Sequence, residues 1–274
     1  MRLVDSLQFS GHTDPGRVRS HNEDSIHIDA ANGLVVLADG MGGYRAGEVA
    51  SAIAVRSIRD FIVNGLGGLA AGGDGDVGEY SPEAQLVRHA IMHANREIVS
   101  AARRETRYEG MGTTVVAMLF HDARVTIGHV GDSRAYRLRG EQLEQLTIDH
   151  SLLQELVSRG VYTAEEAQSS PNRNIVTRAL GVEREVDVDL LQDMVLPADL
   201  YLLCSDGLND MVGDDEIRLT MNRLGGNLDR MTQGLVAAAN ERGGRDNISV
   251  IAARVAPSFD NHKGLFGRIV DLLP

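Results

Sequence analysis

Hydrophobic side chains recur along the chain with two different periods, and each period fills its own blocks of sequence. Over residues 48–63 they recur every three or four positions, which predicts an amphipathic helix. A second long helix is expected to begin at Ser81, a favoured N-cap residue, because Pro82 behind it suits the first helical turn. Further helices are predicted over 151–158, 214–224 and 228–242.

Short apolar or alternating runs, bounded by turn residues, predict the strands. These runs are 25–30, 34–38, 113–120, 124–129, 133–139, 142–147, 185–191, 199–205 and 247–255. Because helices neighbour helices and strands neighbour strands, the order indicates an α+β layered fold rather than a doubly wound sheet. Short polar turns join the four runs between residues 113 and 147, which predicts one antiparallel meander there.

One domain over residues 1–256 is expected, because no internal repeat and no credible linker interrupts the pattern. Two polar segments within it, 65–80 and 160–174, are expected to be loops. The tail, residues 257–274, carries apolar residues spaced as in a short amphipathic helix. We expect this helix to dock on its own domain, and contact with a partner is the alternative.

Composition narrows the functional classes. The chain has 274 residues, of which 43% are hydrophobic, enough for a sizeable core. Tryptophan is absent and aromatic residues make up only 4%, so the core must be mostly aliphatic. A net charge of -12 repels phosphate backbones and argues against a nucleic-acid partner. The acidity fits either a well-solvated surface or a site that gathers cations.

The expected location follows from the terminus and the cysteine count. The first ten residues lack the apolar core of a signal peptide, and no apolar run approaches the length of a membrane span. The lone cysteine, Cys204, follows two leucines, so we expect a packed core thiol rather than a nucleophile. A single cysteine cannot form a disulfide within the chain, which suits a reducing cytosol. We therefore expect a cytoplasmic protein without a membrane partner.

Four aspartates follow or precede hydrophobic runs with glycine close by: Asp39, Asp132, Asp206 and Asp246. Strands fix such carboxylates in place, and glycine lets a ligand approach the backbone closely. Carboxylates that meet at one end of a sheet repel one another unless cations lie between them. Hard oxygen ligands favour Mg²⁺ or Mn²⁺ over zinc. The alternative is that each aspartate belongs only to a turn, and spacing alone leaves that alternative open.

Two histidines offer a different candidate site. His89 and His93 lie four residues apart on the second long helix, a spacing that can bind zinc. No third ligand is evident near them in the sequence, so we expect both to be ordinary residues of the helix surface.

Further short motifs accompany the aspartates. They are TDPGRVRSHNED at 13–24, DGMGG at 39–43, GTT at 112–114, GDSR at 131–134, SDG at 205–207 and DN at 246–247. In this combination and order the chain resembles the type 2C serine/threonine protein phosphatases, which depend on metal ions, in their compact bacterial form. The resemblance covers residues 8–255. It implies a four-layer α-β-β-α sandwich of two antiparallel sheets flanked by helices, with a binuclear Mn²⁺ or Mg²⁺ centre in a cleft at the sheet edges.

The resemblance implies a role for each matching residue of the metal centre. Asp39 matches the carboxylate that bridges the two core metals, and Gly40 matches the residue that offers a backbone carbonyl to one of them. Asp206 and Asp246 match carboxylates on the other metal. Asp132, together with Asp206, matches the pair that can hold a third, weaker metal.

Two residues of the N-terminal motif also match. Asp24 matches an acid that binds metal-bound water, and Arg19 matches the arginine that clamps substrate phosphate. The planar, bidentate donors of arginine suit phosphate oxygens. Two alternatives involve no substrate: Arg19 is an ordinary surface arginine, and Asp24 caps a helix or a turn.

The general acid is the point at which the chain departs from the pattern. Many eukaryotic members carry a histidine after the Asp–Gly pair, where this chain has Met41, which cannot transfer a proton. A metal-bound water can serve instead. His150 is a weaker candidate, because Asp149 or Ser151 is expected to cap a helix there. The segment 160–174 matches a flap beside the cleft, which either gates entry or is an inert loop.

The implied function is hydrolysis of phosphoserine and phosphothreonine in proteins by a metal-bridged water, which reverses the action of a serine/threonine kinase. Phosphorylated proteins, a kinase and its substrates are the expected partners, and a monomer is the expected state. Two alternatives stay open: a phosphoprotein-binding module with little turnover, and a phosphoesterase that acts on small molecules.

Overall fold

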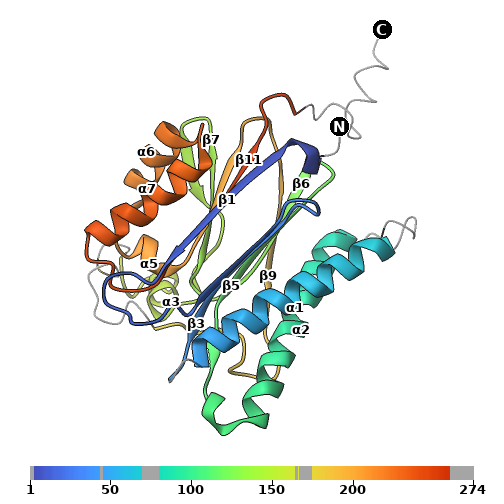
Figure 1. Ribbon diagram of the computed structural model, residues 1–274, viewed down its shortest axis with the longest axis vertical. Helices are drawn as coiled ribbons and strands as arrows, with labels where there is room; N and C mark the ends of the chain where they lie inside the picture. The colour runs from blue at the N-terminus through green and yellow to red at the C-terminus, as the bar shows by residue number, and fades with distance from the viewer. Residues whose placement is uncertain (1–2, 44–45, 70–79, 164–165, 167–174, 260–274) are drawn as a thin grey trace.

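Two antiparallel β-sheets pack face to face, and each carries helices on its outer face (Figure 1). The computed structural model describes residues 3–43, 46–69, 80–163, 166 and 175–259. The arrangement confirms the predicted α+β class and the four-layer α-β-β-α sandwich. Within the described segments, no helix has both the length and the apolar character that crossing a bilayer requires.

The first sheet joins segments that are far apart in the sequence. Its strand order is β1-β11-β10-β7-β8. The strands are β1 (Leu7–Asp14), β7 (Arg134–Arg139), β8 (Gln142–Gln145), β10 (Leu200–Cys204) and β11 (Ile248–Val255). β1 runs beside β11 with Leu7 opposite Val255, so residues near the two ends of the described chain share one hydrogen-bonded ladder (Figure 1).

The second sheet has the strand order β2-β3-β5-β6-β9, and β4 pairs with β3. The strands are β2 (Asp24–Asp29), β3 (Leu34–Met41), β4 (Gly112–Thr113), β5 (Val115–His121), β6 (Arg124–Val130) and β9 (Asp189–Met194). Asp24 lies directly opposite Asp39 in the β2–β3 pair. This register brings two carboxylates to the same edge of the sheet.

Long helices cover the outer faces. The helices α1 (Ala46–Leu69) and α2 (Pro82–Arg104) pack on the second sheet, and α6 (Asp214–Leu224) and α7 (Leu228–Glu241) pack on the first (Figure 1). Shorter helical segments are η1 (Leu3–Ser6), η2 (Thr106–Tyr108), α3 (Leu152–Ser158) and α5 (Asp206–Asn209). The helix α2 begins as predicted, because Ser81 Oγ accepts the backbone N–H of Ala84 at 3.2 Å and Pro82 is its first residue.

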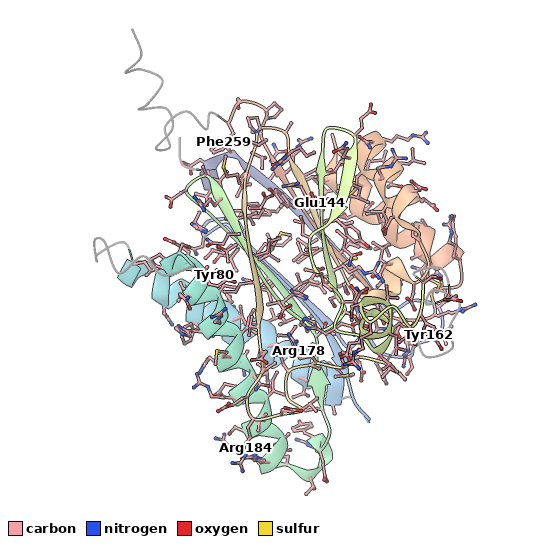
Figure 2. The ribbon with its side chains drawn as sticks, turned by 180° about the vertical axis from the view of Figure 1, so that it is seen from behind. Tyr80, Glu144, Tyr162, Arg178, Arg184 and Phe259 are labelled. Atoms are coloured by element: carbon pink, nitrogen blue, oxygen red, sulfur yellow. The ribbon has the colours of Figure 1, made fainter. Side chains whose placement is uncertain are left out.

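Apolar side chains fill the space between the sheets (Figure 2). Phe120 on β5 and Tyr201 on β10 meet there edge to face, with ring centroids 5.4 Å apart. Fully burying one large apolar side chain stabilises a fold by about 1.5–3 kcal/mol. Cys204 is also buried, and burial raises the pKa of its thiol to about 12. The predicted core thiol is therefore confirmed.

The predicted meander is wrong, because its strands divide between the two sheets. β5 and β6 pair in the second sheet, whereas β7 and β8 pair in the first. The chain changes sheets at Gly131–Asp132–Ser133, where Gly131 has a φ of +109°. Both strands that flank this crossover are largely buried, so hydrophobic pattern alone does not say to which sheet each belongs.

Three other local predictions differ from the structure. Residues 65–69, predicted as loop, continue α1, because Gly65 allows Leu86 of α2 to pack closely; a side-chain carbon there would lie 2.3 Å from Leu86 Cδ1. The strand predicted over 185–191 is β9, shifted to 189–194 by its pairing with β6. The strand β1 was not predicted, because its mixed polar sequence becomes a strand only through pairing with β11.

Parts of three predicted segments lie outside the described residues. These parts are 70–79 of the first loop, 164–165 and 167–174 of the matched flap, and 260–274 of the tail. The flap and the tail helix therefore stay predictions.

Candidate active site

A cavity of about 350 Å³ opens beside the crossover from β6 to β7. Its lining residues are Arg19, Ser20, His21, Glu23, Asp39, Gly40, Met41, Gly42, Thr114, Asp132, Val176, Asp206, Asp246 and Asn247. The cavity thus brings together all the predicted site residues except Asp24, from widely separated segments of the chain.

Backbone contacts fix Asp39 in β3. Its carbonyl oxygen accepts the backbone N–H of Thr114 at 2.9 Å and the Oγ1 hydroxyl of Thr113 at 2.8 Å. Its own N–H donates to Thr114 Oγ1 at 3.2 Å. At Gly40 a side-chain carbon would lie 2.2 Å from the carbonyl oxygen of Gly47. The motif at 112–114 therefore holds the aspartate, and glycine is required where two backbone segments pass so closely.

A second close approach lies at Gly207. Asp206 begins α5 directly after β10, and Asp246 lies just before β11. A side-chain carbon on Gly207 would lie 2.0 Å from the carbonyl oxygen of Asn247. Only glycine lets these two segments pass, and their approach brings the carboxylates of Asp206 and Asp246 to the same cavity.

Asn247 ties the N-terminal motif to this wall of the cavity. Its Nδ2 donates to the carbonyl oxygens of Pro15 and His21 at 3.0 and 2.8 Å. Its Oδ1 accepts the backbone N–H of Glu23 at 2.8 Å. These three hydrogen bonds hold the segment that carries Arg19 against the aspartates.

Asp24 lies behind the cavity rather than in its lining. It begins β2, so the alternative of a helix cap is excluded. Its Oδ2 accepts the hydroxyl of Ser205 at 2.9 Å, whereas its buried Oδ1 has no hydrogen-bond partner among the described residues. A buried carboxylate oxygen without a partner is costly, so this oxygen marks a position suited to a water or a cation.

The carboxylates of the site interact strongly. Burial raises the pKa of Asp39 well above its ordinary value, and the nearby charges of Asp24, Asp206, Asp132 and Asp246 raise it further. Burial is likewise the main reason why the pKa of Asp206 is raised well above its usual range. Burial also raises the pKa of Asp24 and that of Asp132 to about 6. Such a group of acids is stable only when protons or cations neutralise it.

The donor set fits hard divalent cations. Four aspartates line one cavity with their carboxylates: Asp39, Asp132, Asp206 and Asp246. Gly40 belongs to the same lining. Oxygen donors favour Mn²⁺ or Mg²⁺ over zinc, and a cation between carboxylates replaces their repulsion with attraction.

Arg19 lies at the rim of the cavity. Its Nη2 donates to Asp246 Oδ2 at 2.7 Å, and 56% of its side chain is exposed. An ion pair this exposed contributes little to stability. Its planar donors are therefore better explained by an anion that enters the cavity than by a structural role.

Several lining residues were not predicted as site residues. Glu23 and His21 lie within the N-terminal motif, and Asn247 within the final one, but no periodicity in the sequence distinguishes them from their neighbours. Burial raises the pKa of Glu23. Met41 lines the cavity at the place where some relatives of the resembled family carry histidine.

His150 does not line the cavity. Its ring is buried, and its Nδ1 accepts the backbone N–H of Gly131 at 3.0 Å. The helix cap is Ser151, whose Oγ accepts the N–H of Gln154 at 3.2 Å. On α2, His93 packs against Phe61 with the ring planes tilted by 36°, and within the described segments neither His89 nor His93 belongs to a group of three metal-ligating side chains.

A wider groove of about 540 Å³ lies elsewhere, between β7, β8 and α6. Its lining includes Arg137 and Arg139, but both guanidinium groups already have partners. Arg137 pairs with the carboxylate of Asp193, and Arg139 pairs with that of Asp199. The charge of this groove is therefore neutralised within the protein, and the acidic cavity remains the candidate active site.

Comparison with known proteins finds relatives that match most of the chain. A family model described as protein phosphatase 2C matches residues 16–247. The serine/threonine phosphatase stp of Listeria monocytogenes is 41% identical over 244 residues, which cover 87% of this chain and 92% of that protein. The crystal structure of the Mycobacterium tuberculosis serine/threonine phosphatase PstP/Ppp matches with a TM-score of 0.80 and 36% identity, over 91% of this chain and 99% of that one.

A second solved structure bears on the metal question. It is the catalytic domain of the serine/threonine protein phosphatase PstP in complex with two manganese ions. It matches with a TM-score of 0.77 and 35% identity, over 91% of this chain and 98% of that chain.

Proposed function

The chain belongs to the protein phosphatase 2C family, and on that basis we propose that it removes phosphate from phosphoserine and phosphothreonine in proteins with the help of divalent metal ions. The observation that carries the proposal is the convergence of Asp39, Asp206 and Asp246 on one cavity beside Arg19. The raised pKa of Asp39 supports it, because cations would relieve the same repulsion that favours its protonation.

Each residue has a proposed task. Asp39, Asp206 and Asp246 would hold two Mn²⁺ or Mg²⁺ ions together with the Gly40 carbonyl, and Asp132 would contribute with Asp206 to a third, weaker site. Such ions, when bound, supply an activated water near neutral pH and stabilise charge on a phosphoryl group.

The remaining tasks concern water and substrate. Asp24 has one buried oxygen free to accept a hydrogen bond from a water beside Asp39. Arg19 offers two parallel N–H donors to phosphate oxygens and orients the phosphorus for in-line attack. Cys204 is buried and its pKa is raised to about 12, so a covalent cysteine intermediate has no part in the proposal.

The proposed substrates are phosphorylated proteins, and the enzyme whose action is reversed would be a serine/threonine kinase. We propose residues 1–256 as the catalytic domain, acting as a monomer in the cytoplasm. The family match over 16–247 supports the domain, and the single buried cysteine suits a reducing compartment.

Phosphate release from a phosphothreonine peptide tests the proposal. We expect release that requires Mn²⁺ or Mg²⁺ and stops when EDTA removes the metal. A phosphoprotein-binding module would bind the peptide without metal-dependent turnover. A small-molecule phosphoesterase would give higher kcat/KM on nucleotides or sugar phosphates than on the peptide.

The variant Arg19→Ala should raise KM for the phosphopeptide about tenfold and change kcat less. Charge-assisted hydrogen bonds are worth about 1.5–3 kcal/mol, and 1.4 kcal/mol corresponds to a factor of ten. The measurement is steady-state kinetics at saturating Mn²⁺. Arg17→Ala is the matched control, because Arg17 is exposed in the same motif and does not line the cavity. Equal KM values for the two variants would exclude Arg19 as the phosphate clamp.

A further inference from the structure

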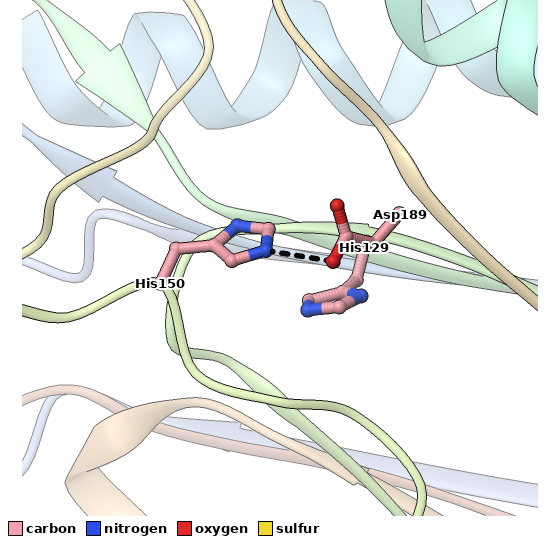
Figure 3. Close-up of side chains that lie close together, drawn as sticks. All are labelled: His129, His150 and Asp189. Carbon is pink, nitrogen blue, oxygen red and sulfur yellow. Dashed lines mark ion pairs between the residues drawn. The ribbon is translucent and has the colours of Figure 1, made fainter. Parts of the chain in front are cut away.

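Two histidines and an aspartate outside the lining of the cavity have the spacing of a metal site (Figure 3). The rings of His129 and His150 stack with centroids 4.6 Å apart, and His150 Nε2 lies 3.2 Å from Asp189 Oδ2. The two rings are buried, whereas half of the Asp189 side chain is exposed. The hydrogen bonds around His150 decide whether this group could bind a metal.

The proton of the His150 ring is placed by its neighbours. The backbone N–H of Gly131 points at Nδ1 from 3.0 Å, so Nδ1 must carry a lone pair. Burial lowers the pKa of His150, which favours the neutral ring. The single ring proton then lies on Nε2 and points at the carboxylate of Asp189. With both ring nitrogens engaged, His150 has no lone pair left for a metal ion.

Arg178 completes the arrangement. Its Nη1 donates to Asp189 Oδ1 at 2.6 Å and also lies 3.2 Å from His150 Nε2. Two N–H donors cannot bond to each other, so this short approach arises because both donate to the same carboxylate. Asp189 and Arg178 thus fix the tautomer in which Nδ1 is the acceptor.

His150 engages both polar backbone groups of Gly131. In addition to the ring contact, the backbone N–H of His150 donates to the Gly131 carbonyl oxygen at 2.9 Å. A side-chain carbon on Gly131 would lie 2.6 Å from Thr114 Cβ. Gly131 is therefore held between His150 on one side and Thr114 on the other. The next residue is Asp132, whose carboxylate lines the cavity.

The main chain of His150 also contacts a residue next to a second lining residue, Val176. The backbone N–H of Thr177 donates to the His150 carbonyl oxygen at 2.8 Å, and Val176, one residue earlier, lines the cavity. His150 therefore contacts the backbone next to two lining residues, Asp132 and Val176, through its ring and through its main chain.

We propose that His150 is a positioning residue, which uses the acceptor Nδ1 to hold Gly131 and thereby directs the Asp132 carboxylate into the cavity, with Asp189 and Arg178 keeping its ring in the required tautomer. The consequence for metal binding at Asp132 rests on the proposed function. The hydrogen-bond arrangement itself does not, and it can be tested without any turnover.

The first test uses ¹⁵N NMR of the full chain in Mg²⁺. The His150 ring should show a protonated Nε2 and an unprotonated Nδ1, and the Gly131 amide should exchange slowly with solvent. His150→Ala should speed exchange of the Gly131 amide at least about tenfold. His150→Asn places an amide oxygen close to the Nδ1 position and should restore slow exchange, whereas His150→Gln, which mimics the Nε2 position, should not.

The second test measures the Mn²⁺ concentration for half-maximal phosphate release. His150→Ala and His150→Gln should raise this Mn²⁺ concentration about tenfold, because loss of a residue that supports a metal ligand typically weakens metal binding by about tenfold or more. His150→Asn should stay near the wild-type value. A protonated Nδ1, unchanged Gly131 exchange in His150→Ala, or zinc bound through His129 and His150 would overturn the proposal. If the His150 tautomer and the Gly131 exchange are as expected but the protein has no phosphatase activity, only the proposed function is refuted. The positioning role of His150 then stands.

Discussion

Replacing Asp39 by asparagine should lower kcat/KM for a phosphothreonine peptide by about 10³-fold or more. Asp39 would hold the cations with a carboxylate, and a neutral amide is a weaker ligand for them. Metal-ion catalysis contributes several kcal/mol, of which each 1.36 kcal/mol is a factor of ten. The measurement is steady-state kinetics at saturating Mn²⁺, with circular dichroism to show that the fold is retained. Asp206→Asn should behave in the same way, because its carboxylate lines the same cavity and is half-buried like that of Asp39.

The turn between β5 and β6 offers a matched control. Asp122 does not line the cavity, and its side chain is 89% exposed. Its φ of +49° suits asparagine, so Asp122→Asn should fold and retain full activity. Wild-type kcat/KM in Asp39→Asn would refute the proposed role of Asp39 in holding the cations.

The second large effect concerns the free energy of unfolding, measured in EDTA so that no metal is bound. We expect this free energy to fall as the pH rises from about 4 to 8. The pKa of Asp24 and that of Asp132 are raised to about 6 in the fold, against an ordinary value of 3.8. A group with a raised pKa binds its proton more tightly when folded. The contribution of such a group to the free energy of unfolding is therefore fully present below pH 3.8 and is lost as the pH rises through 6. For one such carboxyl the loss is on the order of 3 kcal/mol, at 1.36 kcal/mol per unit.

The more strongly raised pKa values of Asp39 and Asp206 should extend this loss above pH 6. Urea unfolding at pH 5 and pH 8 in EDTA measures the difference. The variant Asp39→Asn serves as the control, because it removes one of the repelling charges. It should be more stable than the wild type at pH 8 and should show a smaller pH dependence.

Adding Mn²⁺ at pH 8 should reverse the loss. A ligand at about a thousand times its Kd stabilises the folded state by about 4 kcal/mol, which raises Tm by about 10 °C for a domain of this size. The rise should be much smaller in Asp39→Asn. A wild-type Tm that responds neither to pH nor to Mn²⁺ would show that the carboxylates do not form the cation site proposed here.

Much of the site is visible in the sequence because its residues break local patterns. Asp39 and Asp206 each end a hydrophobic run and stand beside a glycine, a context that a buried strand does not otherwise need. The structure explains the glycines by close backbone approaches at Gly40 and Gly207. Residue identity and position therefore point to these aspartates before any fold is known.

The convergence of these aspartates on one cavity cannot be predicted from the sequence pattern, since it depends on pairings between distant segments. Asp246 reaches the cavity because β11 lies between β1 and β10, and Asp132 reaches it because the chain changes sheets after β6. Hydrophobic periodicity reports which side chains are buried, and it carries no information on which strands become neighbours. This is why the meander was predicted in one sheet and why β1 was missed.

The supporting residues were harder still to predict. Asn247 acts through three hydrogen bonds to backbone groups of residues 15–23, and the ring of His150 accepts one backbone amide, that of Gly131. Such contacts exist only after the segments have met, and neither residue differs in type from many polar residues at turns. Asn247 lies in a motif and His150 is a candidate general acid in the sequence, but the contacts of both residues come only from the structure.

The pairing of β1 with β11 has a consequence for biosynthesis. Leu7 pairs with Val255, so the N-terminal strand finds this neighbour only when nearly the entire described chain has left the ribosome. Asp246, just ahead of β11, arrives equally late. A nascent polypeptide lacking these last segments has neither the complete first sheet nor all the acidic residues of the cavity. It would be inert towards phosphoproteins, and dephosphorylation would begin only once translation has passed the final strand.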